Sequence, residues 1–217
     1  MTSFSRSLAV KRCCDIMGAM AGIMLSAPVM CIIGGLIGWK MGLPVFFKQS
    51  RPGRLTKPFH LFKFRTMTGQ PDPQSRCLPD EQRLTRLGKH LRASSLDELP
   101  ELFNVIKGDM SLVGPRPLLM QYLKRYTPEQ MRRHEMKPGL TGWAQVNGRN
   151  AIGWEERFKL DVWYVDHWSL WLDVKIILLT MKQIIRREGI NHPGEATMSE
   201  FNPVRHGCLT LRASRKG

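Results

Sequence analysis

The pattern of hydrophobic and polar positions begins with a long apolar run. Residues 16–39 contain no charged side chain over twenty-four positions. A straight helix of this length, rising about 1.5 Å per residue, would cross a bilayer. Pro28 lies at the midpoint of the run, where it removes a backbone hydrogen bond and clashes with the preceding turn. The pattern therefore predicts a membrane helix that is interrupted at Pro28.

Basic residues flank this run on both sides. Three lie before it and five follow it, namely Arg6, Lys11, Arg12, Lys40, Lys48, Arg51, Arg54 and Lys57. Positive side chains prefer the cytoplasmic side of a membrane, so a re-entrant helix that enters and leaves by one face satisfies both flanks. A single span that tolerates its proline fits the residues about as well. We adopt the re-entrant, helix–break–helix form as the prediction.

Shorter segments with strand-like or helical patterns follow the apolar run. Residues 44–67 read as two strands joined by an Arg-Pro-Gly turn, and residues 70–79 as a polar, proline-rich surface loop. Leu84, Leu87 and Leu91 would share one face of a helix over 80–91. Two further helices are predicted over 117–126 and 128–136. Residues 137–150 are rich in glycine and have no helical period, so they are predicted to form a loop.

The last predicted helices cover residues 154–164 and 170–187. The second is amphipathic, with one apolar side made of Val174, Ile177, Leu178, Met181, Ile184 and Ile185. Its other side is basic, and Trp163, Trp168 and Trp171 cluster just before it. Such a helix suits the plane of the lipid headgroups. A helix that packs its apolar side on the core and solvates its lysines fits the pattern equally well.

Net charge and cysteine spacing limit the classes of partner and site that the chain can have. The chain of 217 residues is long enough for one domain with a core, and 33 Lys+Arg against 18 Asp+Glu give a formal charge of +15. Nucleic acid, an anionic membrane or a phosphorylated substrate would each be attracted. The basic residues are spread along the chain without a recognition helix or interleaved aromatics, which argues against nucleic acid. The five cysteines lack C-x-x-C spacing, so they indicate free thiols on the cytoplasmic side rather than disulfides or zinc.

Two adjacent carboxylates, Asp97 and Glu98, are the first candidates for chemistry. Ser95-x-x-Glu98 matches a capping box, a common structural motif. Pro100 argues against this interpretation, because it would fall after the first turn of a helix capped by Ser95. A helix that begins at Asp97 places Pro100 in its first turn, and a helix N-terminus attracts anions. The residues alone leave both interpretations open.

Nearby cations would suit a phosphate ligand. Arg116 stands between Pro115 and Pro117, which restrict its backbone and lower the entropic cost of aiming its guanidinium. Lys63 and Arg92 could add positive charge. Taken one at a time, such residues are more often solvated surface charges.

Two long motifs carry a family resemblance. "RASSLDELPELFNVIKGDMSLVGPRPLL" and "RRHEMKPGLTGWAQVNGRN" closely resemble the bacterial sugar transferases, specifically the small monotopic phosphoglycosyl transferases. The resemblance extends over nearly the whole chain. The ending "GINHPGEATMSEF" is similar to the subgroup that acts on UDP-diacetylbacillosamine and other amino sugars. One departure is that Ala27, not the serine found in many relatives, directly precedes Pro28.

The resemblance implies a fold and a reaction. The fold would be mainly α, with a re-entrant membrane helix (1–40), a small α/β cytosolic catalytic body with interfacial amphipathic helices (41–188) and a C-terminal tail (189–217). The reaction would move a phospho-sugar from a UDP-sugar to polyprenol phosphate, such as undecaprenyl phosphate, and release UMP. It would be the first membrane step of glycoprotein, O-antigen or capsule synthesis, on the anionic cytoplasmic leaflet of the bacterial inner membrane.

The resemblance also assigns roles to residues. Asp97 would be the nucleophile that forms an aspartyl-phosphosugar in a ping-pong mechanism, and it would also bind Mg²⁺. Glu98 would be catalytic, with its role as base, metal ligand or orienting group left open. Lys63, Arg92 and Arg116 would steady the phosphates.

The glycine-rich segment supplies two further candidates. Gln145 and Arg149 are the polar residues expected to meet the nucleotide or its diphosphate, although a structural turn explains the glycines as well. The residues do not identify the sugar or the oligomeric state, and a homodimer is one expectation.

Two other functions compete with this one. A non-catalytic membrane-surface scaffold would use the same basic and amphipathic elements but would not need Asp97 and Glu98. An enzyme that transfers the sugar alone would release UDP rather than UMP.

Overall fold

The computed structural model describes residues 3–68, 83–148, 152–186 and 201. Arg149, the predicted loop over 70–79 and nearly all of the predicted tail lie outside the described residues. Helices dominate the part of the chain that is described, and two small sheets accompany them. The predicted mainly α class with a small strand content is therefore confirmed.

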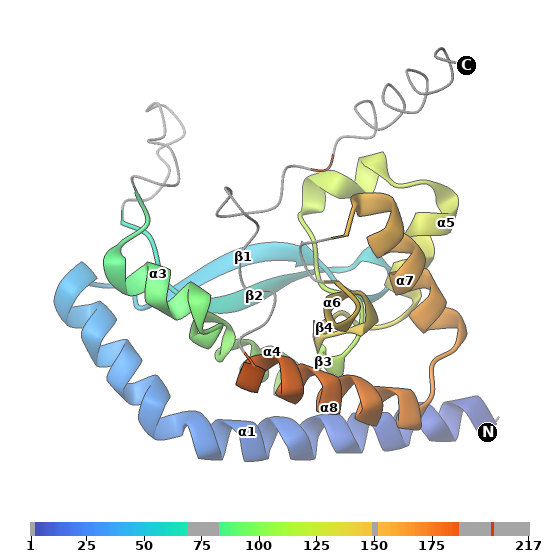
Figure 1. The fold of residues 1–217 in the computed structure, drawn as a ribbon, viewed down its shortest axis with the longest axis horizontal. Coiled ribbons are helices and arrows are strands. Elements are labelled where there is room, and N and C mark those ends of the chain that lie inside the picture. The colour runs from blue at the N-terminus through green and yellow to red at the C-terminus, as the bar shows by residue number, and fades with distance from the viewer. Residues whose placement is uncertain (1–2, 69–82, 149–151, 187–200, 202–217) are drawn as a thin grey trace, which may run out of the picture.

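Helix α1 (Ser3–Met41) is continuous, with Pro28 inside it. The predicted break is therefore absent. Figure 1 shows α1 running along the base of the molecule and turning upward in its C-terminal part, and a proline is an ordinary cause of such a bend. Pro28 leaves the Met24 carbonyl without its helical donor. The nearby Ser26 hydroxyl does not replace that donor, because it donates to the Gly22 carbonyl at 2.6 Å.

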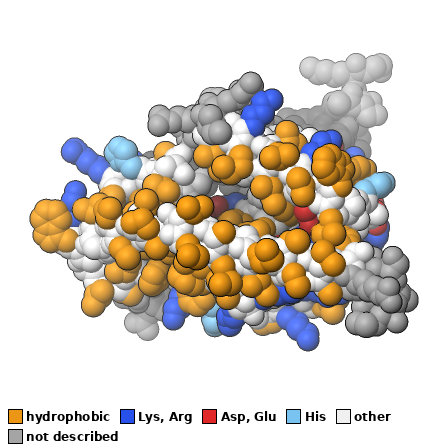
Figure 2. All heavy atoms as spheres, turned by 90° about the horizontal axis from the view of Figure 1, so that it is seen from below, with side chains coloured by type: hydrophobic (Ala, Val, Ile, Leu, Met, Phe, Trp, Pro, Cys, Tyr) orange, Lys and Arg blue, Asp and Glu red, His pale blue; other side chains and the backbone are white. Residues whose placement is uncertain are grey.

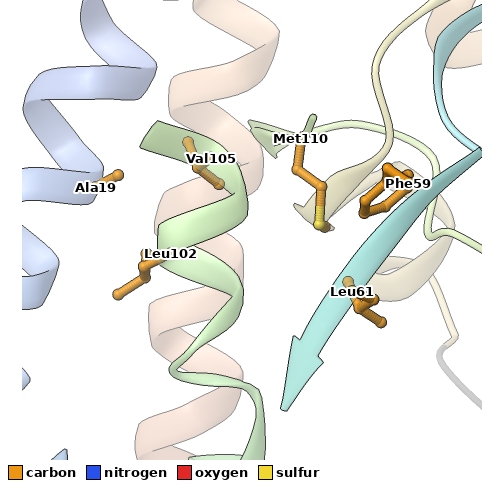
Figure 3. Close-up of a cluster of buried hydrophobic side chains, with 6 residues drawn as sticks. All are labelled: Ala19, Phe59, Leu61, Leu102, Val105 and Met110. Atoms are coloured by element: carbon orange, nitrogen blue, oxygen red, sulfur yellow. The ribbon is translucent and has the colours of Figure 1, made fainter. Parts of the chain in front are cut away.

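Both ends of α1 pack on the rest of the molecule. In its N-terminal half, Ala19 belongs to a buried cluster in which α4 (Glu101–Lys107) lies between α1 and strand β2, as Figure 3 shows. Near its C-terminal end, Ile33 and Ile37 are buried against Phe64 and Leu91. The helix is therefore a structural part of the body and not an appended anchor.

The basic residues before the apolar run are structural as well. The Lys11 ammonium is buried and lies 2.6 Å from Asp173 Oδ2. Arg12 donates to the carbonyls of Val105 and Ile106 at the end of α4, at 2.6 and 2.7 Å. These two residues do not serve as free flanking charges, which removes part of the reasoning behind the re-entrant prediction.

The predicted hairpin is confirmed. Strands β1 (Phe46–Pro52) and β2 (Pro58–Phe64) pair antiparallel, with Phe47 opposite Lys63 and Arg51 opposite Phe59. The connection is longer than an Arg-Pro-Gly turn, because Pro52 belongs to β1 and a 3₁₀ turn, η1 (Arg54–Thr56), follows.

A second sheet lies where a loop was predicted. Strand β3 (Ser111–Val113) runs parallel to β4 (Gly139–Thr141), and the short helix α6 (Trp143–Val146) follows β4. The prediction of a loop over 137–150 was therefore wrong in part. A Cβ at Gly139 would lie 2.1 Å from the Gly114 nitrogen, so the two backbones approach too closely for any side chain. Such long-range pairing leaves no local period.

The remaining helices are mostly short. They are α3 (Arg86–Ala93), η2 (Leu96–Glu98), η3 (Met120–Arg125), α5 (Pro128–Met131), η4 (Arg132–Glu135), α7 (Trp154–Asp166) and α8 (Leu170–Arg186). Thr85 caps α3 by accepting from the Gly88 nitrogen at 2.9 Å, so this helix begins later than predicted. The helix predicted over 117–126 is the 3₁₀ turn η3, and the one over 128–136 divides at Arg132.

An apolar surface covers the base of the molecule. Figure 2 shows hydrophobic side chains gathered over this face, and α1 is long and apolar enough to cross a membrane by length and composition. The exposed apolar side chains on α1 and α8 include Met17, Met24, Leu25, Trp171, Val174, Leu178, Met181 and Ile184. Helix α8 buries Leu172 and Ile176 instead, so the apolar side predicted for it faces outward and does not form the core.

The tryptophan cluster is only partly exposed. Trp168 donates from Nε1 to Asp173 Oδ2 at 3.1 Å, and Trp163 stacks between Trp143 and His167. Trp171 is the most exposed of the three predicted residues, at 74%. Of the three, Trp171 therefore has the most surface available to a membrane.

Candidate active site

The acid pair lies in a 3₁₀ turn and not at a helix mouth. Ser95 adopts the left-handed conformation with φ 57° and makes no side-chain cap hydrogen bond, so the capping box is not formed. Pro100 is the N-cap residue of α4, and η2 ends before it. The alternative of a helix that begins at Asp97 is therefore also wrong. A proline is tolerated at this point because its missing N–H would have no helical partner.

Glu98 is committed to two cations. Lys63 Nζ lies 2.6 Å from Glu98 Oε1, and the Arg116 guanidinium donates to both carboxylate oxygens. Burial alone would raise the pKa of Glu98, but Arg116 and Lys63 outweigh it and hold the pKa well below its ordinary value. Glu98 is therefore ionised at neutral pH, and both of its carboxylate oxygens accept from cations. Among the roles left open, this geometry favours orientation of Lys63 and Arg116.

Asp97 differs from its neighbour. It is 8% exposed, and its carboxylate makes no hydrogen bond or ion pair with any residue that the structure describes. Burial and the charge of Glu98 raise the pKa of Asp97, and Lys63, Arg92 and Arg116 offset this only in part, so the net pKa is raised. Asp97 is thus an uncommitted carboxylate in a cationic setting, which suits a nucleophile or a metal ligand.

A third carboxylate, Glu101, was missed from the sequence. Its Oε1 lies 3.2 Å from Lys63 Nζ and its side chain is 4% exposed. Burial and the neighbouring Glu98 raise the pKa of Glu101 to about 7. Its spacing of three residues from Glu98 was the available signal, since residues three apart share one side of a helical turn.

Lys63 and Arg92 are held by the surrounding fold. Asn104 is fully buried and clamps β2, accepting from the Phe62 nitrogen at 3.0 Å and donating to the His60 carbonyl at 2.7 Å. This clamp fixes the strand that carries Lys63. Burial lowers the pKa of Lys63, but Glu98 and Glu101 outweigh it, so the net pKa is raised and the amine stays charged. Arg92 donates from Nε to Thr66 Oγ1 at 3.1 Å and also acts electrostatically on Asp97.

A buried ion pair supports the Arg116 loop from behind. Arg133 Nη2 lies 2.7 Å from Asp161 Oδ2, and these side chains are 1% and 2% exposed. The same nitrogen donates to the Arg116 carbonyl at 2.8 Å. The sequence offered no signal for this pair, because the two residues are separated by 28 positions and lie on different elements.

Gln145 lies beside the same loop. A Cβ at Gly142 would lie 2.2 Å from the Gly114 carbonyl oxygen and 2.6 Å from Gln145 Oε1, so the glycine-rich segment packs against the start of the Gly-Pro-Arg-Pro loop. Both amide atoms of Gln145 are buried and have no hydrogen-bond partner among the described residues. An unpartnered buried amide fits a ligand-binding role, although no contact joins Gln145 to Asp97 or Glu98.

The candidate site offers Mg²⁺ a carboxylate ligand but no cage made by the protein alone. No group of three or more His, Cys, Asp and Glu suited to a metal occurs in the described part of the chain. Mg²⁺ usually takes one or two carboxylates together with substrate phosphates, so a dedicated protein cage is not required. The free carboxylate of Asp97 meets that lesser demand.

Comparison with known proteins decides the family. The family model described as bacterial sugar transferase matches residues 6–187. The chain belongs to the bacterial sugar transferase family. The match covers the described elements from α1 to α8, and so includes the acid pair, the Arg116 loop and the glycine-rich segment. The resemblance identified from the two long motifs is confirmed.

Several curated members of the bacterial sugar transferase family are similar to this chain. The uncharacterized sugar transferase EpsL of Bacillus subtilis is 53% identical over 88% of this chain and 95% of its own length. The undecaprenyl-phosphate galactose phosphotransferase of Salmonella typhimurium is 38% identical over 83% of this chain and 41% of its own length. The UDP-glucose:undecaprenyl-phosphate glucose-1-phosphate transferase of Escherichia coli is 38% identical over 79% and 39%. The chain thus spans nearly all of EpsL but about two-fifths of these two longer relatives.

Proposed function

We propose that this chain transfers a phospho-sugar from a UDP-sugar to polyprenyl phosphate and releases UMP. The observation that carries the proposal is the buried, uncommitted Asp97 carboxylate beside an acid, Glu98, that is saturated by Lys63 and Arg116. The names of the Salmonella and Escherichia coli relatives describe undecaprenyl-phosphate sugar-phosphate transfer and support the same reaction class.

The chemistry would proceed in two displacements. An Asp97 carboxylate oxygen attacks the sugar-bearing phosphorus, and the bond from that phosphorus to the bridging oxygen breaks, so UMP leaves with the electron pair. An oxygen of polyprenyl phosphate then attacks the same phosphorus and the bond to Asp97 breaks. The acceptor is already anionic at neutral pH, so neither step requires a general base. This fits a Glu98 that orients cations and does not take up protons.

Charge compensation would come from the neighbouring cations. Lys63 and Arg116 are fixed by Glu98 on one side and can donate charge-assisted hydrogen bonds to the donor phosphates on the other. Arg92 lowers the pKa of Asp97 and so favours its reactive, ionised form. Mg²⁺ held by Asp97 and the substrate phosphates would further neutralise the diphosphate.

The membrane would be approached from one side. Both halves of α1 pack on the body that carries Asp97, and α8 presents an apolar side on the same face of the molecule (Figure 2). We infer that α1 enters and leaves the cytoplasmic leaflet by one face and that α8 lies in the headgroup region. With this arrangement, a lipid phosphate in the membrane and a soluble nucleotide-sugar could both reach the body that carries Asp97.

Product analysis tests the reaction. The purified full chain in detergent would receive Mg²⁺ and a panel of UDP-sugars that includes UDP-diacetylbacillosamine, UDP-galactose and UDP-glucose, first without and then with polyprenyl phosphate. We expect about one equivalent of UMP per active site from the correct donor alone, and continued UMP release once the lipid is added. Asp97→Asn should abolish both, whereas Asp166→Asn, which changes an exposed carboxylate, should not.

Two outcomes would contradict the proposal. Release of UDP in place of UMP would mean transfer of the sugar alone. Absence of turnover across the panel, with polyprenyl phosphate demonstrably bound, would favour the membrane-surface scaffold.

A further inference from the structure

The β1–β2 hairpin carries a second cation toward the site. Phe47 and Arg51 are four residues apart and therefore lie on the same face of β1. The register places Phe47 opposite Lys63 of β2. Arg51 and Lys63 therefore project from one face of the hairpin. Arg51 also donates from Nη1 to the Pro117 carbonyl at 3.5 Å, which places its guanidinium beside the loop that carries Arg116.

Arg51 has few partners for a partly buried guanidinium. Nη2 donates to Gln49 Oε1 at 2.6 Å, and Nε is buried without a hydrogen-bond partner among the described residues. Within the same described ranges, no carboxylate lies at ion-pair distance from Arg51. The acids that influence it electrostatically, Glu98 and Glu101, are already paired with Lys63.

This state is unfavourable for the protein alone. Burial and the charge of Arg116 both lower the pKa of Arg51, and Glu101 and Glu98 compensate only in part. A buried cation without a committed counter-ion costs free energy, so its retention is explained when a ligand supplies the negative charge. Two guanidiniums beside each other match the two phosphates of a diphosphate.

We propose that Arg51 and Arg116 together bind the diphosphate of the nucleotide-sugar donor, with Arg51 on the phosphate that leaves as UMP. The assignment rests on the proposed function. Asp97 must contact the sugar-bearing phosphorus, and Arg116 acts electrostatically on Asp97 and on Arg51. The cations that act most strongly on Asp97 are Lys63, Arg92 and Arg116, so the more distant phosphate falls to Arg51. When the bridging bond breaks, negative charge grows on that phosphate and Arg51 stabilises it.

Binding of UDP to the full chain in detergent with Mg²⁺ tests this assignment. The variants are Arg51→Gln, Arg51→Lys and, as a matched control on the same hairpin, Arg54→Gln, which changes an exposed arginine. We expect the Kd of UDP to rise at least tenfold in Arg51→Gln, less in Arg51→Lys, and less than twofold in Arg54→Gln. We also expect the Tm of ligand-free Arg51→Gln to stay the same or rise, because an uncompensated charge has been removed.

The results that would overturn the Arg51 assignment differ from those that would overturn the proposed reaction. A Kd for UDP within twofold of wild type in Arg51→Gln would show that Arg51 does not bind the diphosphate. Weaker binding accompanied by a lower Tm in both Arg51 variants would make Arg51 structural. If wild type binds no UDP, the assignment also fails. The proposed reaction is judged separately by UMP release from wild type. UMP release with unchanged UDP binding in Arg51→Gln would refute only this inference, and Arg51-dependent UDP binding without UMP release would refute only the reaction.

Discussion

Asp97 and Glu98 are adjacent in sequence and equal in charge, yet their surroundings separate their chemistry. Glu98 receives Lys63 and Arg116 and is held ionised, whereas Asp97 is left without a hydrogen bond in the described structure. Glu101 shares Lys63 with Glu98 and is disfavoured as an anion. Three carboxylates within five positions therefore have three different environments, and these follow from the position of two cations.

Replacement of Glu98 tests its role as an orienting group. Glu98→Gln removes the anion that positions Lys63 and Arg116, so we expect kcat to fall by about 10²–10³, similar to loss of a preorganised electrostatic group. The acidic limb of the pH–rate profile should persist, because it would report ionisation of Asp97. Loss of that limb together with the rate would identify Glu98 as a proton acceptor. Glu156→Gln, an exposed acid on α7, serves as the control.

The raised pKa of Glu101 predicts a pH-dependent stability. The ordinary value of 4.5 is raised to about 7 in the folded protein. Below pH 4.5 Glu101 is protonated in both folded and unfolded chains and carries no penalty, and above pH 7 it is ionised in both and the penalty is complete. Wild type should therefore lose stability relative to Glu101→Gln as the pH rises through this window, by a value on the order of 3 kcal/mol.

Thermal unfolding across that pH range measures the difference. A wild-type Tm that runs parallel to that of Glu101→Gln between pH 4.5 and 7 would show that Glu101 is not strained as an anion.

Among the elements, α1 and α8 are joined by a buried polar cluster. Lys11 of α1 pairs with Asp173 of α8 at 2.6 Å and donates to the Val113 carbonyl at 3.1 Å. The Tyr164 hydroxyl donates to Asp173 Oδ1 at 2.7 Å, and Trp168 donates to Oδ2. One carboxylate thus ties the two most apolar helices to α7 and β3. This polar cluster holds α1 and α8 in a fixed position relative to each other, and therefore determines the shape of the apolar face.

Loss of that carboxylate should destabilise the whole assembly. Asp173→Asn leaves the buried Lys11 ammonium without a counter-ion, and breaking such a pair typically costs about 3–5 kcal/mol. Denaturation in detergent would show a lower midpoint. Lys11→Met combined with Asp173→Asn should recover much of the loss, because the unpaired charge is gone and an acceptor remains for Tyr164 and Trp168. Lys182→Gln, on the exposed side of α8, should have little effect, and a similar loss there would contradict the role of the pair.

At the scale of the molecule, one face is apolar and the catalytic candidates lie within the body above it. Both halves of α1 contact that body, through Ala19 and through Ile37. A helix that carried its two ends to opposite sides of a membrane would have to give up one of these contacts. The fold therefore favours a single side for both ends.

Labelling with a membrane-impermeant maleimide tests this topology. Cys13, which is exposed near the start of α1, would be the single cysteine in one variant, and Lys89→Cys would report the body in another. In inverted membrane vesicles both should react, and in intact spheroplasts neither should. Reaction of the two positions from opposite sides would establish a single span and exclude the re-entrant form.

Local features were predictable from the sequence. The antiparallel hairpin and the amphipathic character of α8 follow from repeats of two and about 3.6 residues, which neighbouring residues express without help from distant ones. The sequence left open whether the apolar side of α8 faces outward, and its prediction of a break in α1 was wrong. The two long motifs also carried the family, and with it the expectation that Asp97 reacts.

Tertiary structure alone decided how the site is organised. The pairing of Lys63 with Glu98, the support of Arg116 by Arg133 and the parallel pairing of β3 with β4 join residues that are far apart in the chain. No local period records such contacts, because they depend on which surfaces meet after folding. The sequence by itself determined which residues could react and which helices are apolar. Folding decided that Glu98 is neutralised and Asp97 left free, because two cations reach only one of two adjacent acids.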